Sequence, residues 1–337
     1  MIEKNTVLIL GAGASMPYGF PSGKQLISEI YHLKANIADP LIRACNNEDN
    51  TAKSFFRELV MADPPSIDTY LSQHPKYLKI GKGSIAQVIS SHEKEDSLYH
   101  IIKYPKNYTK DTRWYHLLFE LIHENILDGG LIPLSIITFN YDRSLEKFIY
   151  NKLKYMYDKT NEEIKLFFKY FKIIHVYGKI GTLPELKDNN DEYIRYYDNA
   201  IITEENLIKA SNQISLIYDK NPINIIKKEI EKVIVNANNI YFMGFGYHQD
   251  NCDILMIDKY APKDAVIKGT TYELTELEVH RIQKFASRIE FFEVDCKDFM
   301  RNSAMFDDEG EEIDPYNRFP EIPITDPLNG IRNKYRP

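Results

Sequence analysis

Residues 7–15 read Val-Leu-Ile-Leu-Gly-Ala-Gly-Ala-Ser, an apolar run that ends in a pair of glycines, Gly11 and Gly13. A short aliphatic run without polar alternation is typical of a strand buried on both faces of a parallel sheet. A glycine pair after a first strand lets the backbone approach a pyrophosphate, and the following helix adds its amides and dipole. The stretch therefore predicts a nucleotide-binding α/β fold, in which Gly11, Ala12, Gly13 and Ser15 form the phosphate loop.

This loop is not the dehydrogenase fingerprint. The pattern G-x-G-x-x-G needs its third glycine where this chain has Met16. No acidic residue follows clearly at the distance that would suit a ribose contact. A tight structural turn is the alternative interpretation, and the strand–turn–helix context favours nucleotide binding over it.

Further apolar segments recur along the chain, and helical stretches lie between most of them. This repetition predicts a doubly wound, Rossmann-like parallel sheet of about six strands. We expect strands at Val7–Leu10, Leu134–Thr138, Lys172–Tyr177, Ile240–Met243, Ala265–Lys268 and Ile289–Glu293. We expect helices at Gly23–Lys34, Arg143–Tyr157, Thr203–Asp219, Pro222–Ala237 and Tyr272–Ser287.

The gap between the first two predicted strands is too long for one crossover. Residues 38–130 are therefore expected to form an inserted helical subdomain within a catalytic domain of residues 1–302. Phe55–Val60 and Trp114–Ile126 show the apolar spacing of helices. Residues 303–337 are acidic and then rich in proline, which predicts an extended tail.

Composition narrows the possible functions. The net charge is −7 and basic residues are interspersed with acidic ones, so we expect no direct nucleic-acid partner. Cys45, Cys252 and Cys296 are far apart and odd in number, which predicts neither a disulfide framework nor a structural zinc site. A reducing cytoplasm suits such cysteines. No run approaches the ~18 apolar residues of a membrane span, so membrane insertion is not expected.

Polar residues end the second predicted strand, in Thr138-Phe139-Asn140-Tyr141-Asp142. In an open α/β sheet, ligands bind at the carboxyl ends of the strands, and Asn and Asp are poor strand residues. Asn140 and Asp142 are therefore candidate site residues. The alternative is that one of them caps the helix that starts near Arg143.

His175 closes the third predicted strand, which brings it to the same sheet edge as Asn140. A single histidine at a strand end is more often structural than catalytic. A neutral imidazole at this edge could accept a proton from a ribose hydroxyl or an attacking water. After the fourth strand, Gly244 and Gly246 form a second glycine loop, which continues to His248.

Taken together, these motifs resemble the sirtuins, and more closely the bacterial sirtuin-like proteins of antiviral defence. Gly11–Ser15 and Gly19–Gly23 are similar to their G-A-G-x-S and G-[IF]-P-S-G elements. Residues 138–142 resemble T-x-N-Y-D, residues 175–178 resemble His-x-x-Gly, and residues 244–250 resemble G-[FY]-[GS]-[FY]-x-D.

The resemblance implies an NAD+ glycohydrolase that cleaves the bond between nicotinamide and ribose, with NAD+ as its substrate and no metal. Asn140 would lie beside the scissile ribose carbon and position water or ribose. Asp142 would accept a hydrogen bond from the nicotinamide carboxamide, and His175 would serve as the base. Nicotinamide leaves as a neutral molecule, so the leaving group needs no general acid. The implied NAD+-binding residues are Gly11, Ala12, Gly13, Ser15, Thr138, Gly244 and Gly246.

Three departures from the sirtuin pattern bear on the reaction. Phe139 replaces a glutamine, Ser22–Lys24 stands where sirtuins carry Asp-Phe-Arg, and the two Cys pairs of the zinc ribbon are missing. The last two argue against a protein deacylase, which is one alternative. A non-catalytic nucleotide sensor is the other, and it would be expected to have lost Asn140 or His175. The resemblance also implies a homo-oligomer, a partner such as an ATPase, and a role as an antiphage effector that depletes NAD+.

Overall fold

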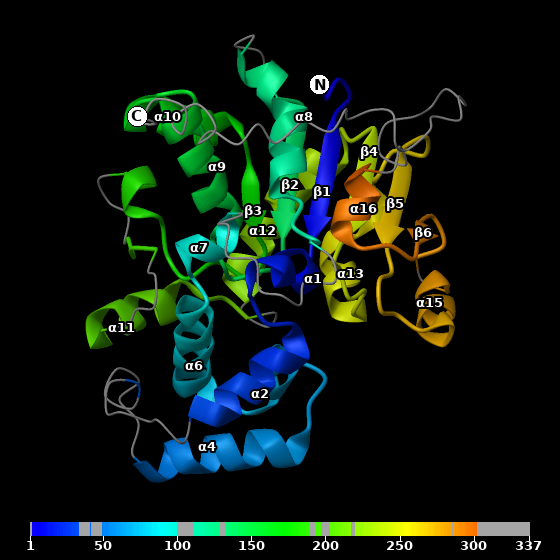
Figure 1. Cartoon of the computed structure of the whole chain (residues 1–337). Helices are drawn as coiled ribbons and strands as arrows, with labels where there is room; N and C mark the ends of the chain where they lie inside the picture. The colour runs from blue at the N-terminus through cyan, green and yellow to red at the C-terminus, as the bar shows by residue number, and fades with distance from the viewer. Residues whose placement is uncertain are drawn as a thin grey trace, which may run out of the picture.

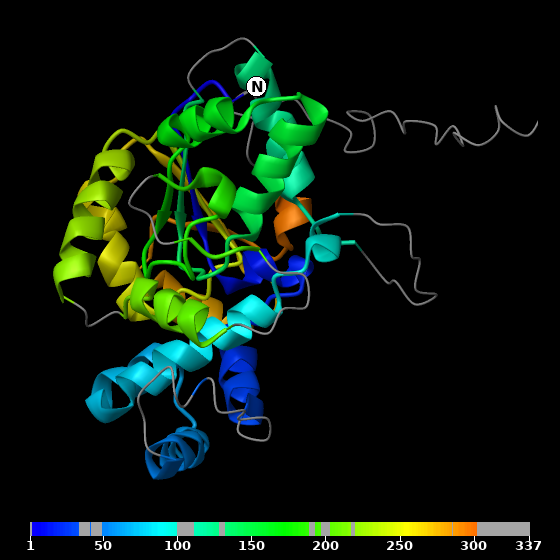
Figure 2. The same ribbon diagram turned by 90° about the vertical axis from the view of Figure 1, so that its left-hand side faces the viewer.

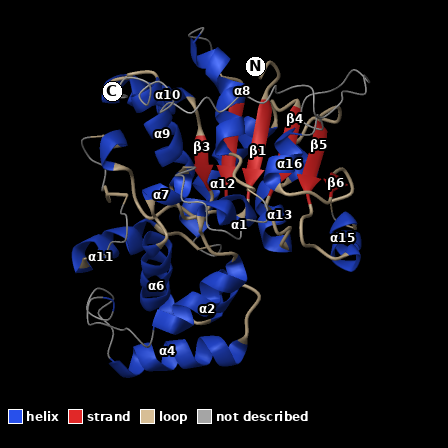
Figure 3. Cartoon of the chain, in the orientation of Figure 1, coloured by secondary structure: helices blue, strands red, loops and turns tan. Residues whose placement is uncertain are grey.

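Six strands pair in one sheet in the order β3-β2-β1-β4-β5-β6, and every pair is parallel. The chain crosses over to both sides of β1, so the sheet is doubly wound and has Rossmann strand order (Figures 1 and 3). The predicted fold class is therefore confirmed. The strands are β1 (Thr6–Leu10), β2 (Leu134–Thr138), β3 (Ile173–His175), β4 (Asn239–Met243), β5 (Val266–Thr270) and β6 (Glu290–Phe292).

The computed structural model describes most of the chain. The described residues are 2–33, 41, 49–99, 111–127, 132–188, 193–196, 203–216, 220–284 and 286–301. The predicted tail of residues 303–337 and Cys45 lie outside them, and the predicted domain boundaries stay a prediction.

Helices flank the sheet on both faces. On one face α8 contacts α9 and α16, and on the other α12 contacts α13, α14 and β3 (Figures 1 and 2). This cover explains why the central strands are apolar on both sides. The helices are α1 (Ala12–Ser15), α2 (Gly23–Leu33), α4 (Asp49–Ala62), α5 (Ile67–Gln73), α6 (Leu78–Ser91), α7 (Glu95–Leu98), α8 (Tyr115–Leu127), α9 (Ser144–Met156), α10 (Asn161–Tyr170), α11 (Glu204–Gln213), α12 (Lys220–Ile234), α13 (Gln249–Leu255), α14 (Ile257–Tyr260), α15 (Glu276–Gln283) and α16 (Cys296–Arg301).

Two helices are shorter than the sequence predicts. The helix predicted at Tyr272–Ser287 begins only at Glu276, because Thr275 and Glu278 form a capping box that starts it there. The helix predicted at Thr203–Asp219 ends at Gln213, because the next residue leaves helical geometry and forms a β-bridge with Gly178. A capping box thus set the first boundary, and a β-bridge to a distant part of the chain set the second.

Insertion helices lie beyond the carboxyl ends of the strands. Both views show α2, α4 and α6 as a separate group on that side of the sheet (Figures 1 and 2). They pack on one another through buried apolar side chains such as Ile30, Phe55, Leu59 and Ile85. The group therefore faces the edge at which an α/β sheet binds its ligands.

Trp114 anchors the end of the long insertion to the first loop. The indole is fully buried and donates from Nε1 to the carbonyl of Ala14 at 2.9 Å. The hydroxyl of Tyr18 accepts hydrogen bonds from the backbone amides of Trp114 and Tyr115, and the rings of Tyr18 and Tyr115 stack 3.7 Å apart. These contacts hold the loop that follows β1 against Trp114 and Tyr115.

Candidate active site

A cavity of about 400 Å³ opens at the carboxyl edge of the sheet. The loops after β1, β2, β3 and β4 line it together, since the carboxyl ends of parallel strands meet at one edge. Helix α5 of the insertion provides the opposite wall. Of the predicted site residues, Gly11, Ala12, Gly13, Ser15, Asn140, Asp142, Gly244 and Gly246 line the cavity, and Thr138 and His175 do not.

The two glycine loops pack backbone against backbone. The amide of Gly13 donates to the carbonyl of Gly244 at 2.9 Å. A Cβ on Gly11 would lie 2.5 Å from the Gly244 oxygen, and one on Gly13 would lie 2.8 Å from the Gly244 Cα. Gly244 itself has φ +57, a left-handed conformation that favours glycine. These glycines are therefore required by the contact between the loops, whatever ligand the loops also hold.

Asn140 is held on three sides. Its Nδ2 donates to the carbonyl of Gly11 and to Oγ of Ser15, each at 2.9 Å. Its backbone amide donates to Oγ1 of Thr138 at 3.1 Å, so Thr138 supports Asn140 from behind the cavity. Because both side-chain N–H groups are used, Oδ1 is the polar atom of Asn140 left to meet a ligand, and it can only accept.

Asp142 combines the two roles that the sequence left open. Its Oδ1 accepts hydrogen bonds from the amide and the hydroxyl of Ser144, the first residue of α9, so it acts as a local cap. The same residue lines the cavity. Burial raises the pKa of Asp142, and hydrogen bonds from Ser144 and Ser15 oppose that rise. The carboxyl is therefore fixed in place before any ligand arrives.

His175 lies behind the cavity wall. Its Nδ1 is 2.9 Å from the backbone carbonyl oxygen of Asn140, and its Nε2 is 2.9 Å from Oε1 of Glu146. The side chain is buried, and Lys179 also donates to Oε1 of Glu146 at 2.9 Å. His175 thus contacts Asn140, which lines the cavity, but does not line the cavity itself.

Phe139 supplies an aromatic surface to the cavity. Its ring lies edge to face with those of Tyr177 and Phe245, with centroids 5.6 and 5.1 Å apart. All three residues line the cavity. A ring that sits against this cluster would gain apolar contact in place of an amide hydrogen bond.

Helix α5 adds residues that the sequence analysis left without a role. Ser66 caps the helix by accepting from the amide of Thr69, as its position before an apolar run suggests. Asp68, in the first turn of the helix, lines the cavity and accepts from the hydroxyl of Tyr141 at 3.0 Å. Asp250 and Asn251, at the start of α13, also line it. Sequence spacing places α5 in the insertion but does not bring it to the sheet edge.

Arg143 couples the site to the insertion. The guanidinium is fully buried and bonds the carboxylate of Glu93, with Nε 2.9 Å from Oε1. The remaining N–H groups donate to backbone carbonyls, including those of Gly181 and Ile194. Glu93 follows the C-terminal end of α6, so one side chain joins the loop beside Asp142 to the insertion.

Negative charge dominates the cavity. Asp68, Asp142 and Asp250 line it, and no Lys or Arg does so within the described part of the chain. Among the described residues that line the cavity, His248 is the basic side chain. A ligand with a cationic end is therefore favoured beside the aspartates, and a phosphate must rely on backbone amides.

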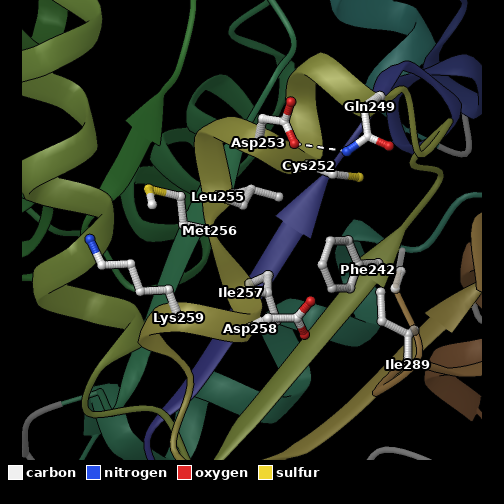
Figure 4. Close-up of a pocket in the computed structure, with 11 residues that line it drawn as sticks. Phe242, Gln249, Cys252, Asp253, Leu255, Met256, Ile257, Asp258, Lys259 and Ile289 are labelled. Carbon is white, nitrogen blue, oxygen red and sulfur yellow. Dashed lines mark hydrogen bonds between the residues drawn. The ribbon is translucent and has the colours of Figure 1, made fainter. Parts of the chain in front are cut away.

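A second cavity of about 370 Å³ is lined mainly by residues of α13 and α14 (Figure 4). Gln249 lines both, and its amide bonds Asp253 at 2.8 Å. No predicted site residue lines the second cavity, and its inner side chains Phe242 and Leu255 belong to the core. The candidate site is therefore the first cavity.

Two searches of the described residues bear on metals and membranes. Among residues 2–301, with the gaps given above, no cluster of three His, Cys, Asp or Glu side chains is placed to hold a metal ion. None of the described helices is long and apolar enough to cross a membrane.

The fold and the site define a doubly wound α/β protein with a polar ligand cavity at the carboxyl edge of its sheet. No protein-family model matches the chain, and no curated protein matches it either. Three solved structures are similar at 13% identity: Sir2Tm bound to a propionylated peptide, Sir2 with an inhibitor, 2'-O-acetyl-ADP-ribose and a deacetylated peptide, and a structure on sirtuin substrate affinity. Their TM-scores are 0.40, 0.39 and 0.37; the first two cover 89% of this chain and 92% of theirs, and the third covers 88% and 91%.

Proposed function

We propose that this chain is an NAD+ hydrolase that cleaves the nicotinamide–ribose bond and releases nicotinamide and ADP-ribose. The observation that carries the proposal is the fixed acceptor Oδ1 of Asn140 in a cavity beside the glycine loop. An acceptor suits a donor ligand, and both the ribose hydroxyls and an attacking water are donors. The sirtuin-like motifs of the sequence support the same substrate.

The cavity residues suit two parts of NAD+, its central diphosphate and its nicotinamide end. Gly11 and Gly13 bring the backbone within reach of the diphosphate, which is the part that needs amide donors rather than a lysine. Asp142 and Asp68 line the cavity with Asn140, and they would lie near the nicotinamide end, where the oxidised ring carries positive charge. The Asp142 carboxyl would accept from the carboxamide N–H and so set the rotation of the ring.

The reaction needs little acid–base help. When the bond from ribose C1′ to the ring nitrogen breaks, its electron pair neutralises the charge of the ring, so nicotinamide leaves unprotonated. Water then forms the new bond at C1′ and loses a proton to solvent. Asn140 would hold the water or the ribose in line, and the aspartates would stabilise the positive charge that spreads over the ribose.

The wider role is part of the same proposal. Constant NAD+ hydrolysis would be toxic to the cell that makes the enzyme, so we infer that activity is controlled. Resemblance to sirtuin-like defence proteins supports an antiphage effector that acts in the cytoplasm as a homo-oligomer, with or without a partner such as an ATPase. Light scattering combined with turnover measurements tests this, and a monomer with high constitutive turnover and no toxicity would refute it.

One assay tests the reaction itself. The purified full-length chain is incubated with NAD+, and nicotinamide and ADP-ribose are quantified with and without an acetylated peptide. Equal amounts of both products without peptide are expected. Product formation only with peptide would indicate a deacylase, and NAD+ binding without turnover would indicate a sensor.

Competition of NAD+ analogues against NAD+ in the same assay measures selectivity. NADH lacks the positive charge on its ring, and the deamidated analogue places a carboxylate where Asp142 expects an amide. Both should bind at least about ten-fold more weakly than NAD+, since each loses about one favourable charge or hydrogen-bond contact. Equal binding of all three would contradict the assignment of the aspartates to the nicotinamide end.

A further inference from the structure

His175 lies between two hydrogen-bond acceptors. Nδ1 faces the backbone carbonyl oxygen of Asn140 and Nε2 faces the Glu146 carboxylate, each at 2.9 Å. A carbonyl oxygen has no proton to give, and an ionised carboxylate has none either. Hydrogen bonds from His175 to both acceptors need a proton on each ring nitrogen, which is the positively charged imidazolium.

Glu146 is held in its ionised form. Burial by itself would raise the pKa of this carboxyl, but Lys179 and His175 outweigh burial and hold the pKa well below its usual range. The ammonium of Lys179 lies 2.9 Å from the same oxygen that faces His175. A buried carboxylate with two cationic donors is a stable counter-ion for an imidazolium.

The remaining charged groups around this cluster fit a positive His175. Asp142, on the loop before α9, and Glu93, after α6, both interact electrostatically with Glu146. Arg143 pairs with Glu93, so those two charges compensate each other. Of the two carboxyl groups that remain, Glu146 contacts both Lys179 and His175, and Asp142 adds an acidic group near Glu146.

We propose that His175 is a permanently protonated positioning residue, which Glu146 keeps charged, and that it holds the Asn140 carbonyl rather than acting as a general base. Asn140 would then be fixed at its amide by Thr138, at its carbonyl by His175 and at its side chain by Gly11 and Ser15. With a proton on each ring nitrogen, His175 has no lone pair with which to accept another. The effect of His175 on catalysis rests on the proposed NAD+ hydrolysis, whereas the charge of His175 does not.

The first test is the pH profile of kcat for nicotinamide release, in the wild-type chain and in Glu146→Gln. The wild type should show a flat profile from about pH 5.5 to about pH 8, because His175 stays charged. In Glu146→Gln the ring loses its counter-charge, so kcat should fall about ten-fold at the alkaline end and recover in acid, with KM within about two-fold. A general base predicts the reverse, a wild-type kcat that falls in acid, and that result would overturn the proposal.

Glu205→Gln is the matched control. Glu205 pairs with Lys209 on an exposed helix face, so the same Glu-to-Gln change there removes an acidic partner of a cation away from the site. It should leave both kcat and its pH profile as in the wild type. A profile altered equally in both variants would show that the effect of Glu146→Gln is not specific to His175, and would also overturn the proposal.

The second test reads the charge of His175 without catalysis. In full-length protein with 15N-labelled histidine, the His175 ring is assigned by comparison with His175→Gln, and the protonation of both nitrogens is followed from about pH 6 to about pH 8. Both should stay protonated in the wild type, and one should lose its proton in Glu146→Gln. A neutral His175 at neutral pH in the wild type would refute the proposal. If the wild type releases no nicotinamide, the proposed function fails while this measurement still decides the charge.

Discussion

The side-chain amide of Asn140 donates a 2.9 Å hydrogen bond to the backbone carbonyl of Gly11, 129 residues away in the chain. The bond joins the loop after β2 to the glycine loop after β1. Asn140 therefore belongs to both walls of the cavity, and its orientation depends on the loop that is proposed to hold the diphosphate.

Asn140→Asp should abolish nicotinamide release with little change in fold. The substitution keeps the size of the side chain but removes both N–H donors, and it sets a carboxylate against the Gly11 carbonyl. We expect kcat to fall by about 100-fold or more, comparable to the loss of a fixed polar group in an active site. Circular dichroism checks the fold, and Asn236→Ala, at an exposed helix end, should keep full activity. Retained turnover in Asn140→Asp would remove Asn140 from the site.

Gly13→Ala should destabilise the protein as well as weaken nucleotide binding. The added Cβ would lie 2.8 Å from the Gly244 Cα, and neither backbone can yield without moving its loop. We expect a loss of about 1–3 kcal/mol in the free energy of unfolding, measured by urea denaturation. Gly23→Ala is the matched control for stability, because a Cβ there would meet nothing within 4 Å. Equal stability of the two variants would contradict the packing described here.

Arg143→Met should be among the most destabilising changes in the chain. It leaves the Glu93 carboxylate buried without its cation and removes the donors to the carbonyls of Gly181 and Ile194. Breaking a buried pair in this way costs about 3–5 kcal/mol. The exposed pair of Lys76 and Glu58 gives the contrast, and Lys76→Met should cost far less because solvent screens an exposed pair. Similar costs for the two changes would argue against the coupling assigned to Arg143.

Asp111 should contribute stability that disappears in acid. Burial would raise the pKa of Asp111, but Arg113 and Lys297 outweigh it and lower the pKa to about 2. Because the folded pKa lies below the ordinary 3.8, the contribution is complete above about pH 4 and is lost as the pH falls towards 2. Asp111→Asn should cost about 1 kcal/mol at neutral pH, after allowance for solvent screening, and nothing near pH 2. A cost that does not change with pH would contradict this account.

Metal analysis should find no stoichiometric zinc, and chelators should leave NAD+ turnover unchanged. Burial raises the pKa of both Cys252 and Cys296 to about 12, so these thiols stay protonated and bind metals poorly. Neither belongs to a described cluster of metal-binding side chains. One zinc per chain would overturn this prediction and reopen the deacylase interpretation.

The order of elements follows from local patterns. Each of the six apolar runs became a strand, because an uninterrupted aliphatic segment is stable only where both faces are covered. The carboxyl edge of that sheet could be predicted for the same reason, and Asn140, Asp142 and the glycine loops do line one cavity there. Helix ends were less predictable, since capping bonds such as that of Thr275 decided them.

The sequence by itself thus determined the parallel sheet and the loops that meet at its edge, since apolar runs and strand-end glycines act locally. Only the tertiary structure decided that α5 brings Asp68 to the cavity, and that His175 contacts Glu146 and the Asn140 carbonyl instead of lining it. Those relations depend on how an insertion folds back on the sheet and on which nitrogen of a buried ring meets which partner. Neither the folding of the insertion nor the choice of partners for a buried ring produces a periodic or regularly spaced pattern in the sequence.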